Sequence, residues 1–270
     1  MTQKKKELPY LERDISWMYF NRRILQEAAR PHVPLLERMA FLGIYSNNLD
    51  EFFRVRMATQ NRIAECTDKS TSRESEHAKK LIKQISKQNT EYTKIFEETI
   101  RQTTEDLKKE NIYLISDTEV SSEQLDFIRS YYKEKLSGSI IPIWFSAIRY
   151  FDFENDENIY LAVKVSRQQG TKQISDYAFL ELPVNICGRF IRLPDHEEKS
   201  YLIYLDDVIR CCLPLVFEGL EYTDFQAYAF KFTRDAEMEI DNDLRNGMLQ
   251  KISKGVKSRK KGDALRVIYD

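Results

Sequence analysis

Glycine, histidine and cysteine are scarce in this chain of 270 residues, which contains eight, three and four of them. Phosphate-binding loops need closely spaced glycines, and neither G-x-x-x-x-G-K-S/T nor G-x-G-x-x-G occurs. No Ser/His/Asp or Cys/His set indicates nucleophilic catalysis, so we predict no catalytic residue. We also expect no metal site, because no second ligand at metal spacing accompanies His32, His77 or His196.

The chain also lacks long hydrophobic runs. None approaches the roughly 18 residues that span a bilayer. The N-terminal segment MTQKKKELPYLERD has a basic start but not the apolar stretch of a signal peptide. The cysteines form no C-x-x-C pair, which favours reduced thiols. We expect a cytoplasmic protein without a transmembrane segment, and we leave peripheral attachment to a membrane open.

An excess of one charge is missing as well. Lys and Arg total 42, Asp and Glu total 43, and the net charge is −1. Proteins that coat nucleic acid usually carry a bulk basic excess. We therefore expect no nucleic-acid partner, and a nucleic-acid-binding module built on the basic segment KSRKKG is the weakest alternative.

Apolar residues make up 42% of the chain, enough for a core, and the part up to about residue 110 has the periodicity of helices. The segment RDISWMYFNRRILQEAAR predicts a helix capped by Ser16 or Asp14. Pro34 is placed to open the next helix at its first position. After the polar linker TDKSTSRESE, a long helix is predicted from about Ser75 to Glu110. The expected apolar face of the first helix comprises Trp17, Phe20, Ile24 and Ala28.

Two adjacent asparagines interrupt an apolar run in the segment FLGIYSNNLDEFFRVR. Asparagine is unfavourable inside a helix, so we predict a break there and a new helix from Leu49 to Glu65. Asn48 would cap this helix, with Glu51 completing a capping box. Asn47 has no role in that arrangement.

Arg56 is unusual because helical spacing places it on the same side as Leu49, Phe52 and Phe53. An arginine on an apolar face needs an anionic neighbour. Two interpretations stay open at this point: Arg56 pairs with a carboxylate of the chain, or it faces a cavity that holds an anion.

The second part of the chain predicts a mixed domain. Ser121 and Gln124 are spaced as a capping box for a helix over 121–136. Beyond Gly138, short segments rich in β-branched and aromatic residues predict strands. Pro214 should make the second half of a helix over 206–217 irregular. The predicted strands are NIYLAVKVS, DYAFLELP, GRFIRLP, SYLIYLDD, AYAFKFTRD and the final ALRVIYD.

These patterns predict an α+β protein. An all-helical N-terminal domain over residues 1–110 contains a long antiparallel helix, and a mixed domain over 111–270 contains short, mainly antiparallel strands with helices. A charged helix over 236–253 and the basic loop SKGVKSRKKGD precede the last strand. Because the chain stops directly after that strand, we expect it to be cut from a longer protein.

Lys231 and Arg234 are the remaining candidates for anion contacts. In a strand, Phe230 and Phe232 face one way and Lys231 faces the other, while Arg234 lies where the strand should give way to a helix. A capped helix start with a local salt bridge explains Arg234. The alternative is a basic strand face directed at phosphate or at a neighbouring domain.

Four sequence blocks, taken together and in this order, indicate a protein family: RDISWMYFNRRILQEA, PLLERMAFLGIYSNNLDEFFRVR, IYLAVKV and TRDAEMEI. They resemble the N-terminal part of bacterial polyphosphate kinase, and the resemblance covers essentially the whole chain. Members of that family have a helical domain, a mixed head domain and two C-terminal domains related to the phospholipase D fold. This chain resembles only the first two.

The resemblance implies an ATP-dependent phosphotransferase that builds polyphosphate reversibly through a phosphohistidine. In the family, that histidine and the magnesium ligands belong to the C-terminal domains, so neither is carried over. The second asparagine of SNNLDEF is a nucleotide-binding position in the family, which makes Asn48 the implied ATP contact. The head domain contributes to dimerisation and to a basic tunnel around the polymer. By charge and position, Arg56, Lys231 and Arg234 are candidates for that tunnel.

The expected partners are thus ATP, polyphosphate, the missing catalytic domains and further copies of the chain in a homo-oligomer. We expect the chain alone to be inactive as a kinase. The alternative is a truncated homologue without catalysis that serves as a dimerising or polyphosphate-binding scaffold.

Overall fold

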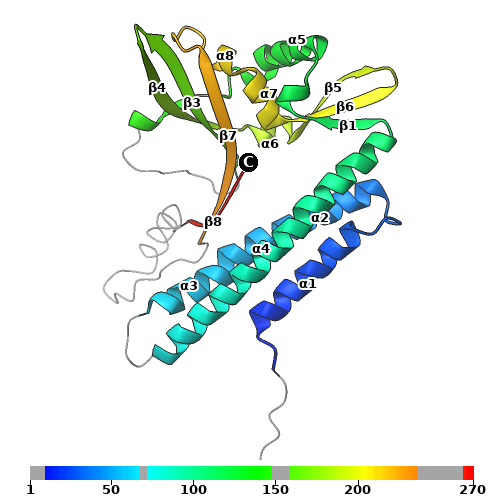
Figure 1. Cartoon of the computed structure of the whole chain (residues 1–270), viewed down its shortest axis with the longest axis vertical. Helices are drawn as coiled ribbons and strands as arrows, with labels where there is room; N and C mark the ends of the chain where they lie inside the picture. Colours follow the sequence, from blue (N-terminus) through cyan, green and yellow to red (C-terminus); the bar gives the residue numbers. More distant parts are fainter. Residues whose placement is uncertain (1–9, 67–71, 148–157, 236–263) are drawn as a thin grey trace, which may run out of the picture. The chain divides into compact units, whose positions relative to one another are not determined.

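A computed structural model describes residues 10–66, 72–147, 158–235 and 264–270 of the chain. The chain forms two compact units, Met1–Thr103 and Thr104–Asp270. The first is helical and the second combines helices with two β-sheets (Figure 1). The predicted α+β class, with a helical part followed by a mixed part, is confirmed.

The first unit is built from long helices that lie alongside one another. Figure 1 shows α2, η1 and α3 following one another along the chain as one rod, with α1 and α4 beside it. The π-helical segment η1 changes the helical pitch within the rod without ending it. The bounds are α1 (Arg13–Ala28), α2 (Leu35–Phe52), η1 (Phe53–Met57), α3 (Ala58–Glu65) and α4 (Ser72–Lys109).

The core of this unit forms where the apolar faces of α1, α2 and α4 meet. Leu25 of α1, Leu49 of α2 and Ile85 of α4 are each almost fully buried in one cluster. Burying such side chains contributes roughly 1.5–3 kcal/mol each. The long helix begins by Ser72, so the second half of the predicted linker is helical.

The predicted apolar face of α1 is confirmed for Ala28 and wrong for Phe20, because the buried face is rotated by part of a turn. Phe20 is 59% exposed and Trp17 is half-buried, whereas Met18 and Leu25 are buried. Two polar residues, Asp14 and Asn21, share the buried face with them. A pattern search that counts only apolar residues therefore selects the neighbouring face.

The predicted cap of α1 is also wrong. Glu12 occupies the cap position, and its carboxylate accepts a hydrogen bond from the Arg13 backbone N–H at 2.9 Å. Asp14 lies in the first turn with its side chain directed into the interior. Pro34 immediately precedes α2 in the capping position, one residue before the predicted one.

The predicted helix break at the asparagines does not occur. Helix α2 continues through Asn47 and Asn48 to Phe52, so Asn48 is not a cap and makes no capping box with Glu51. The side chain of Asn48 instead donates a hydrogen bond to Asn21 of α1. This contact between helices replaces the local backbone contacts that disfavour asparagine in helices. Asn47 is exposed on the outer side of α2.

The second unit contains eight strands within its described part, joined by short helices (Figure 1). The strands are β1 (Ile112–Ile115), β2 (Ile143–Trp144), β3 (Tyr160–Gln169), β4 (Lys172–Glu181), β5 (Phe190–His196), β6 (Lys199–Tyr204), β7 (Asp224–Arg234) and β8 (Ala264–Tyr269). The helical segments are η3 (Asp117–Glu119), α5 (Ser122–Tyr131), η4 (Tyr132–Leu136), η5 (Phe145–Ala147), α6 (Val184–Cys187), α7 (Leu205–Cys211) and α8 (Leu213–Val216).

The strands form two sheets with the orders β1-β6-β5 and β2-β4-β3-β7-β8. All pairs are antiparallel except β1 with β6, which agrees with the predicted, mainly antiparallel arrangement. One core serves both sheets: Leu161 of β3, Ile203 of β6 and Val208 of α7 are fully buried in the same cluster. Strands β1 and β2 were not predicted, because each contains four residues or fewer.

Local signals in this unit are confirmed. The backbone N–H of Ser121 donates to the Gln124 side chain at 3.0 Å, and the Gln124 N–H donates to the Ser121 hydroxyl at 3.3 Å, which is the predicted capping box. The predicted helix over 206–217 is divided at Cys212 into α7 and α8. Pro214, in the first turn of α8, lacks the N–H that a continuous helix would use. The predicted charged helix and basic loop lie outside the described residues.

Candidate functional site

A pocket of about 490 Å³ lies in the first unit, where α1 meets the end of α2 and η1. Its walls combine aromatic rings, two arginines, two carboxylates and one amide. The pocket is lined by Asn48, the implied ATP contact, and by Arg56, a candidate anion contact. The full set is Arg13, Asp14, Trp17, Phe20, Asn48, Glu51, Phe52, Val55 and Arg56.

Arg56 forms an ion pair with a carboxylate from another helix. Its Nε lies 2.9 Å from Oδ1 of Asp14, whose side chain is 3% exposed. Gln60, one turn further along the rod, donates to the other carboxylate oxygen of Asp14 at 3.0 Å. The ion-pair interpretation of Arg56 is therefore confirmed. Burial raises the pKa of the Asp14 carboxyl, and the hydrogen bond from Gln60 opposes this effect.

The ion pair does not occupy the whole guanidinium group. Among the described residues, Arg56 uses only Nε for hydrogen bonding, and its side chain is 31% exposed at the pocket. The two terminal nitrogens of Arg56 can thus still donate to an anion. Arg13 adds a second, largely exposed guanidinium to the same pocket. The two interpretations of Arg56 are compatible in this geometry.

The Asn48 amide belongs to a chain of hydrogen bonds that reaches the interior. Its Nδ2 donates to Oδ1 of Asn21 at 3.1 Å, and Nδ2 of Asn21 donates to the backbone carbonyl of Tyr45 at 3.2 Å. Asn21 is 1% exposed, while Asn48 is half-buried at the wall of the pocket. The amide at the pocket is consequently held by a fully buried partner.

Aromatic rings form another wall. The rings of Trp17 and Phe52 stack with centroids 4.4 Å apart and planes at 17°, and Phe20 is exposed beside them. Flat apolar surface next to cationic groups and an amide suits a ligand that has a planar ring and an anionic group. The chemistry of this pocket is thus that of a binding site; no catalytic group is identified in it.

Lys231 and Arg234 belong to β7 of the second unit, and both are half-buried. Lys231 pairs in register with Ile268 of β8, and the Arg234 guanidinium lies 5.0 Å from the centre of the Phe232 ring. Phe230 and Phe232 both stack on Tyr160, as their predicted common face requires. The tunnel role of these two cations stays a prediction.

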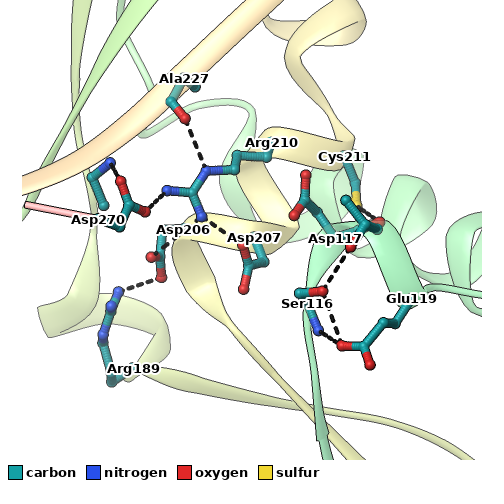
Figure 2. A network of polar contacts seen from close by, with 12 residues as sticks. Ser116, Asp117, Glu119, Arg189, Asp206, Asp207, Arg210, Cys211, Ala227 and Asp270 are labelled. Atoms are coloured by element: carbon teal, nitrogen blue, oxygen red, sulfur yellow. Dashed lines mark hydrogen bonds and ion pairs between the residues drawn. The ribbon is translucent and has the colours of Figure 1, made fainter. Parts of the chain in front are cut away.

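A network of charged side chains, in which Asp206 and Asp207 are buried, surrounds Arg210 of α7 in the second unit (Figure 2). Its guanidinium lies 2.5 Å from Asp207 and 3.7 Å from Asp206, and it also contacts Asp270. Arg189 forms a second pair with Asp206 at 2.5 Å. Because these contacts join α7 to the residue that follows β8 and to the residue that precedes β5, the network is a structural clamp within this unit.

Asp207 should give this unit an unusual pH dependence. Burial raises its pKa from 3.8 to about 6, although the hydrogen bond from Arg210 opposes the shift. A raised pKa means that the folded state binds the proton more tightly than the unfolded chain does. The contribution of this group to the free energy of unfolding should therefore decrease as pH rises from about 4 to about 6, and stay constant above.

Urea unfolding at pH 4 and pH 7 tests this expectation with the Asp207→Asn variant. The difference in free energy of unfolding between the variant and the unsubstituted protein should shift in favour of the variant from pH 4 to pH 7. Asp195→Asn is the control, since Arg192 lowers the pKa of the exposed Asp195 and any effect there has the opposite sign. An identical pH profile for the Asp207→Asn variant and the unsubstituted protein would contradict the assignment.

No group of three or more His, Cys, Asp or Glu side chains within the described ranges could hold a metal ion. No described helix is both long enough and apolar enough to cross a membrane. The four cysteines are free thiols, and burial raises the pKa values of Cys211 and Cys212 to about 11 and about 12.

Sequence reasoning missed the buried, hydrogen-bonding roles of three polar residues of the first unit: Asp14, Asn21 and Gln60. A usable signal existed for two of them. Asp14 and Asn21 fall at helical spacing with Met18 and Leu25, so they interrupt an otherwise apolar face. A polar side chain at such a position needs a buried partner, and Arg56 and Asn48 are those partners.

The chain matches two family models in succession. Residues 10–115 match the polyphosphate kinase N-terminal domain, and residues 123–270 match the polyphosphate kinase middle domain. Among curated relatives, proteins named polyphosphate kinase from Vibrio vulnificus strain YJ016 and Escherichia coli strain K12 are each 34% identical to it. These alignments cover 97% and 96% of this chain but 37% and 38% of the relatives.

A solved structure agrees with the sequence matches. The crystal structure of polyphosphate kinase from Porphyromonas gingivalis superposes with a TM-score of 0.73 at 26% identity, over 96% of this chain and 38% of that one. The chain thus spans little more than a third of the length of these relatives. On the two successive domain matches, this chain belongs to the polyphosphate kinase family and corresponds to its N-terminal and middle domains.

Proposed function

We propose that this chain contributes the ATP-binding edge and part of the polymer path to a polyphosphate kinase, a phosphotransferase. The complete enzyme would transfer the terminal phosphate of ATP reversibly to polyphosphate through a phosphohistidine. Relatives that carry the name polyphosphate kinase support this proposal. In phosphoryl transfer, proteins act mainly by positioning phosphates and neutralising charge, which is what arginines beside a binding pocket can do.

The observation that carries the proposal is the pocket of the first unit. It places the Asn48 amide, the stacked Trp17 and Phe52 rings and the Arg56 guanidinium around one space of about 490 Å³. A nucleotide offers the matching groups: a flat base, polar base edges and a phosphate chain. In this proposal Asn48 contacts the base and Arg56 supports the phosphates.

The other parts of the proposal concern the assembled enzyme. Lys231 and Arg234 would line the path of the polyphosphate, whose binding should then weaken with salt because binding releases the cations condensed on the polymer. The phosphohistidine and the magnesium ligands would come from further domains. Among the described residues of this chain, no group of three or more His, Cys, Asp or Glu side chains could hold the metal ion. Homo-oligomerisation and a cytoplasmic location complete the proposal.

Binding of ATP can be followed through the fluorescence of Trp17, which lines the pocket. The chain has two tryptophans, so a Trp144→Phe background isolates this signal. In that background, ATP should change the emission saturably. Asn48→Ala should weaken binding about tenfold, the effect of losing roughly 1.4 kcal/mol of polar contact.

Asn47→Ala is the matched control, because Asn47 is the exposed neighbour of Asn48 on the same helix. Its affinity should equal that of the background protein. Equal weakening by both substitutions, or no response of Trp17 to millimolar ATP, would refute the pocket as the nucleotide site.

A further inference from the structure

The amide chain from Tyr45 through Asn21 to Asn48 has a fixed direction. The backbone carbonyl of Tyr45 can only accept a hydrogen bond, so the Asn21 group that faces it must be the NH₂ group. The oxygen of Asn21 then faces Asn48, and Asn48 must answer with its own NH₂ group. One backbone carbonyl thereby sets the orientation of both side-chain amides.

The oxygen of Asn48 is the free end of this chain. Among the described residues, its Oδ1 accepts no hydrogen bond, and Asn48 lines the pocket. Because Asn21 is 1% exposed, water cannot readily take its place as the partner of the Asn48 nitrogen. A rotation that exchanged oxygen and nitrogen in Asn48 would place two oxygens against each other, which is unfavourable.

We propose that Asn21 is a positioning residue that holds the Asn48 oxygen toward the pocket, so that the pocket prefers a purine base with an amino group at the 6-position. This inference rests on the proposed function, in which Asn48 contacts the base of ATP. The 6-amino group of adenine donates to an amide oxygen. Hypoxanthine and guanine have an oxygen at the same place, which would leave two acceptors facing each other. A binding site that hydrogen-bonds one polar group of its ligand discriminates against a base that lacks this group, because the buried group of the protein then loses its hydrogen bond.

The decisive measurement compares ATP with ITP, whose bases differ at the 6-position, by Trp17 fluorescence in the Trp144→Phe background. We expect the background protein to bind ATP at least tenfold more tightly than ITP. Asn21→Leu removes the hydrogen-bonding partner of Asn48 and keeps a side chain of similar size. The Asn48 amide can then present either its oxygen or its nitrogen to the pocket. The ATP/ITP ratio should fall below about threefold, since an amide that rotates freely offers either a donor or an acceptor.

Asn21→Asp provides the rescue. Its carboxylate keeps an acceptor for the Asn48 nitrogen, so the preference for ATP should survive even if the variant is less stable. Helical circular dichroism establishes which variants are folded. If Asn21→Leu does not fold, the ATP/ITP affinity ratio of Asn21→Asp decides. A retained preference for ATP supports the positioning role of Asn21, and loss of that preference overturns this role.

The remaining outcomes separate this inference from the proposed function. Binding of neither nucleotide by the background protein would refute the proposed function and this inference with it. Equal binding of ATP and ITP by the background protein would overturn the inference alone. An Asn21→Leu variant that still prefers ATP tenfold would show that the Asn48 amide is oriented without Asn21.

Discussion

Replacing Arg210 by alanine is expected to lower the free energy of unfolding of the second unit by about 3–5 kcal/mol at pH 7. The guanidinium is 14% exposed and faces the carboxylates of Asp206 and Asp207, which are 7% and 9% exposed. Without it, Asp206 keeps its ion pair with Arg189, while Asp207 loses the cation that it contacts. The carbonyl of Ala227 also loses the hydrogen bond it accepts from Arg210 at 3.2 Å.

The loss should be smaller at low pH. Asp207 already has a pKa raised to about 6, and removal of the neighbouring cation raises it further. Protonation then relieves the repulsion, so the Arg210→Ala variant should begin to regain stability above pH 6 and continue to do so as the pH falls further.

Urea unfolding followed by Trp144 emission measures this effect in a Trp17→Phe background. Trp144 belongs to the second unit, where it packs against Phe217 with ring centres 5.7 Å apart. Arg192→Ala is the matched control, since Arg192 is 67% exposed and pairs with the half-exposed Asp195. It should cause no measurable change. If the Arg210→Ala and Arg192→Ala variants unfold at the same urea concentration, the clamp is not important for stability.

Replacing Asp14 by alanine is expected to destabilise the first unit by about 2–4 kcal/mol. The substitution leaves Arg56 without its carboxylate and deprives Gln60, which is 9% exposed, of its acceptor. Removal of one partner from a buried pair often costs 3–5 kcal/mol. The expected loss is smaller here, because Arg56 is 31% exposed and its terminal nitrogens can reach water.

Trp17 emission in the Trp144→Phe background reports this unfolding. Glu98→Ala serves as control, because Glu98 pairs with Arg101 on the surface of α4 and both side chains are more than 60% exposed. No measurable change is expected for it. A double variant, Asp14→Ala with Arg56→Ala, should lose clearly less than the sum of the two single losses. Additive losses would show that the two residues do not stabilise each other.

Much of the architecture could be predicted from local patterns. The helices of the first unit, the Ser121–Gln124 capping box and the irregular helix around Pro214 all follow from side chains acting on their own backbone. The apolar face of α1 could not be predicted by the same means. Asp14 and Asn21 are buried only because other helices supply their partners, and periodicity in one segment does not reveal those partners.

The two asparagines show the same limit. Intrinsic propensity correctly marks Asn47 and Asn48 as poor residues for a helix interior. It does not include the hydrogen bond from Asn48 to Asn21, a residue 27 positions earlier, which lets α2 continue without a break. For Arg56, the sequence identified an abnormal position and two interpretations; the position of Asp14 established the ion pair, and the place of Arg56 at the pocket leaves room for an anion.

By itself, the sequence determined the fold class, the order of most helices and strands, and the family, because these depend on periodicity, turn chemistry and long matching blocks. The tertiary structure decided the roles of individual polar side chains. Asn48 joins α1 to α2 instead of capping a helix, and Arg56 pairs with Asp14 while still lining a pocket. The physical reason is that a buried polar group must find a partner wherever packing provides one, and packing brings together residues that are distant in the chain.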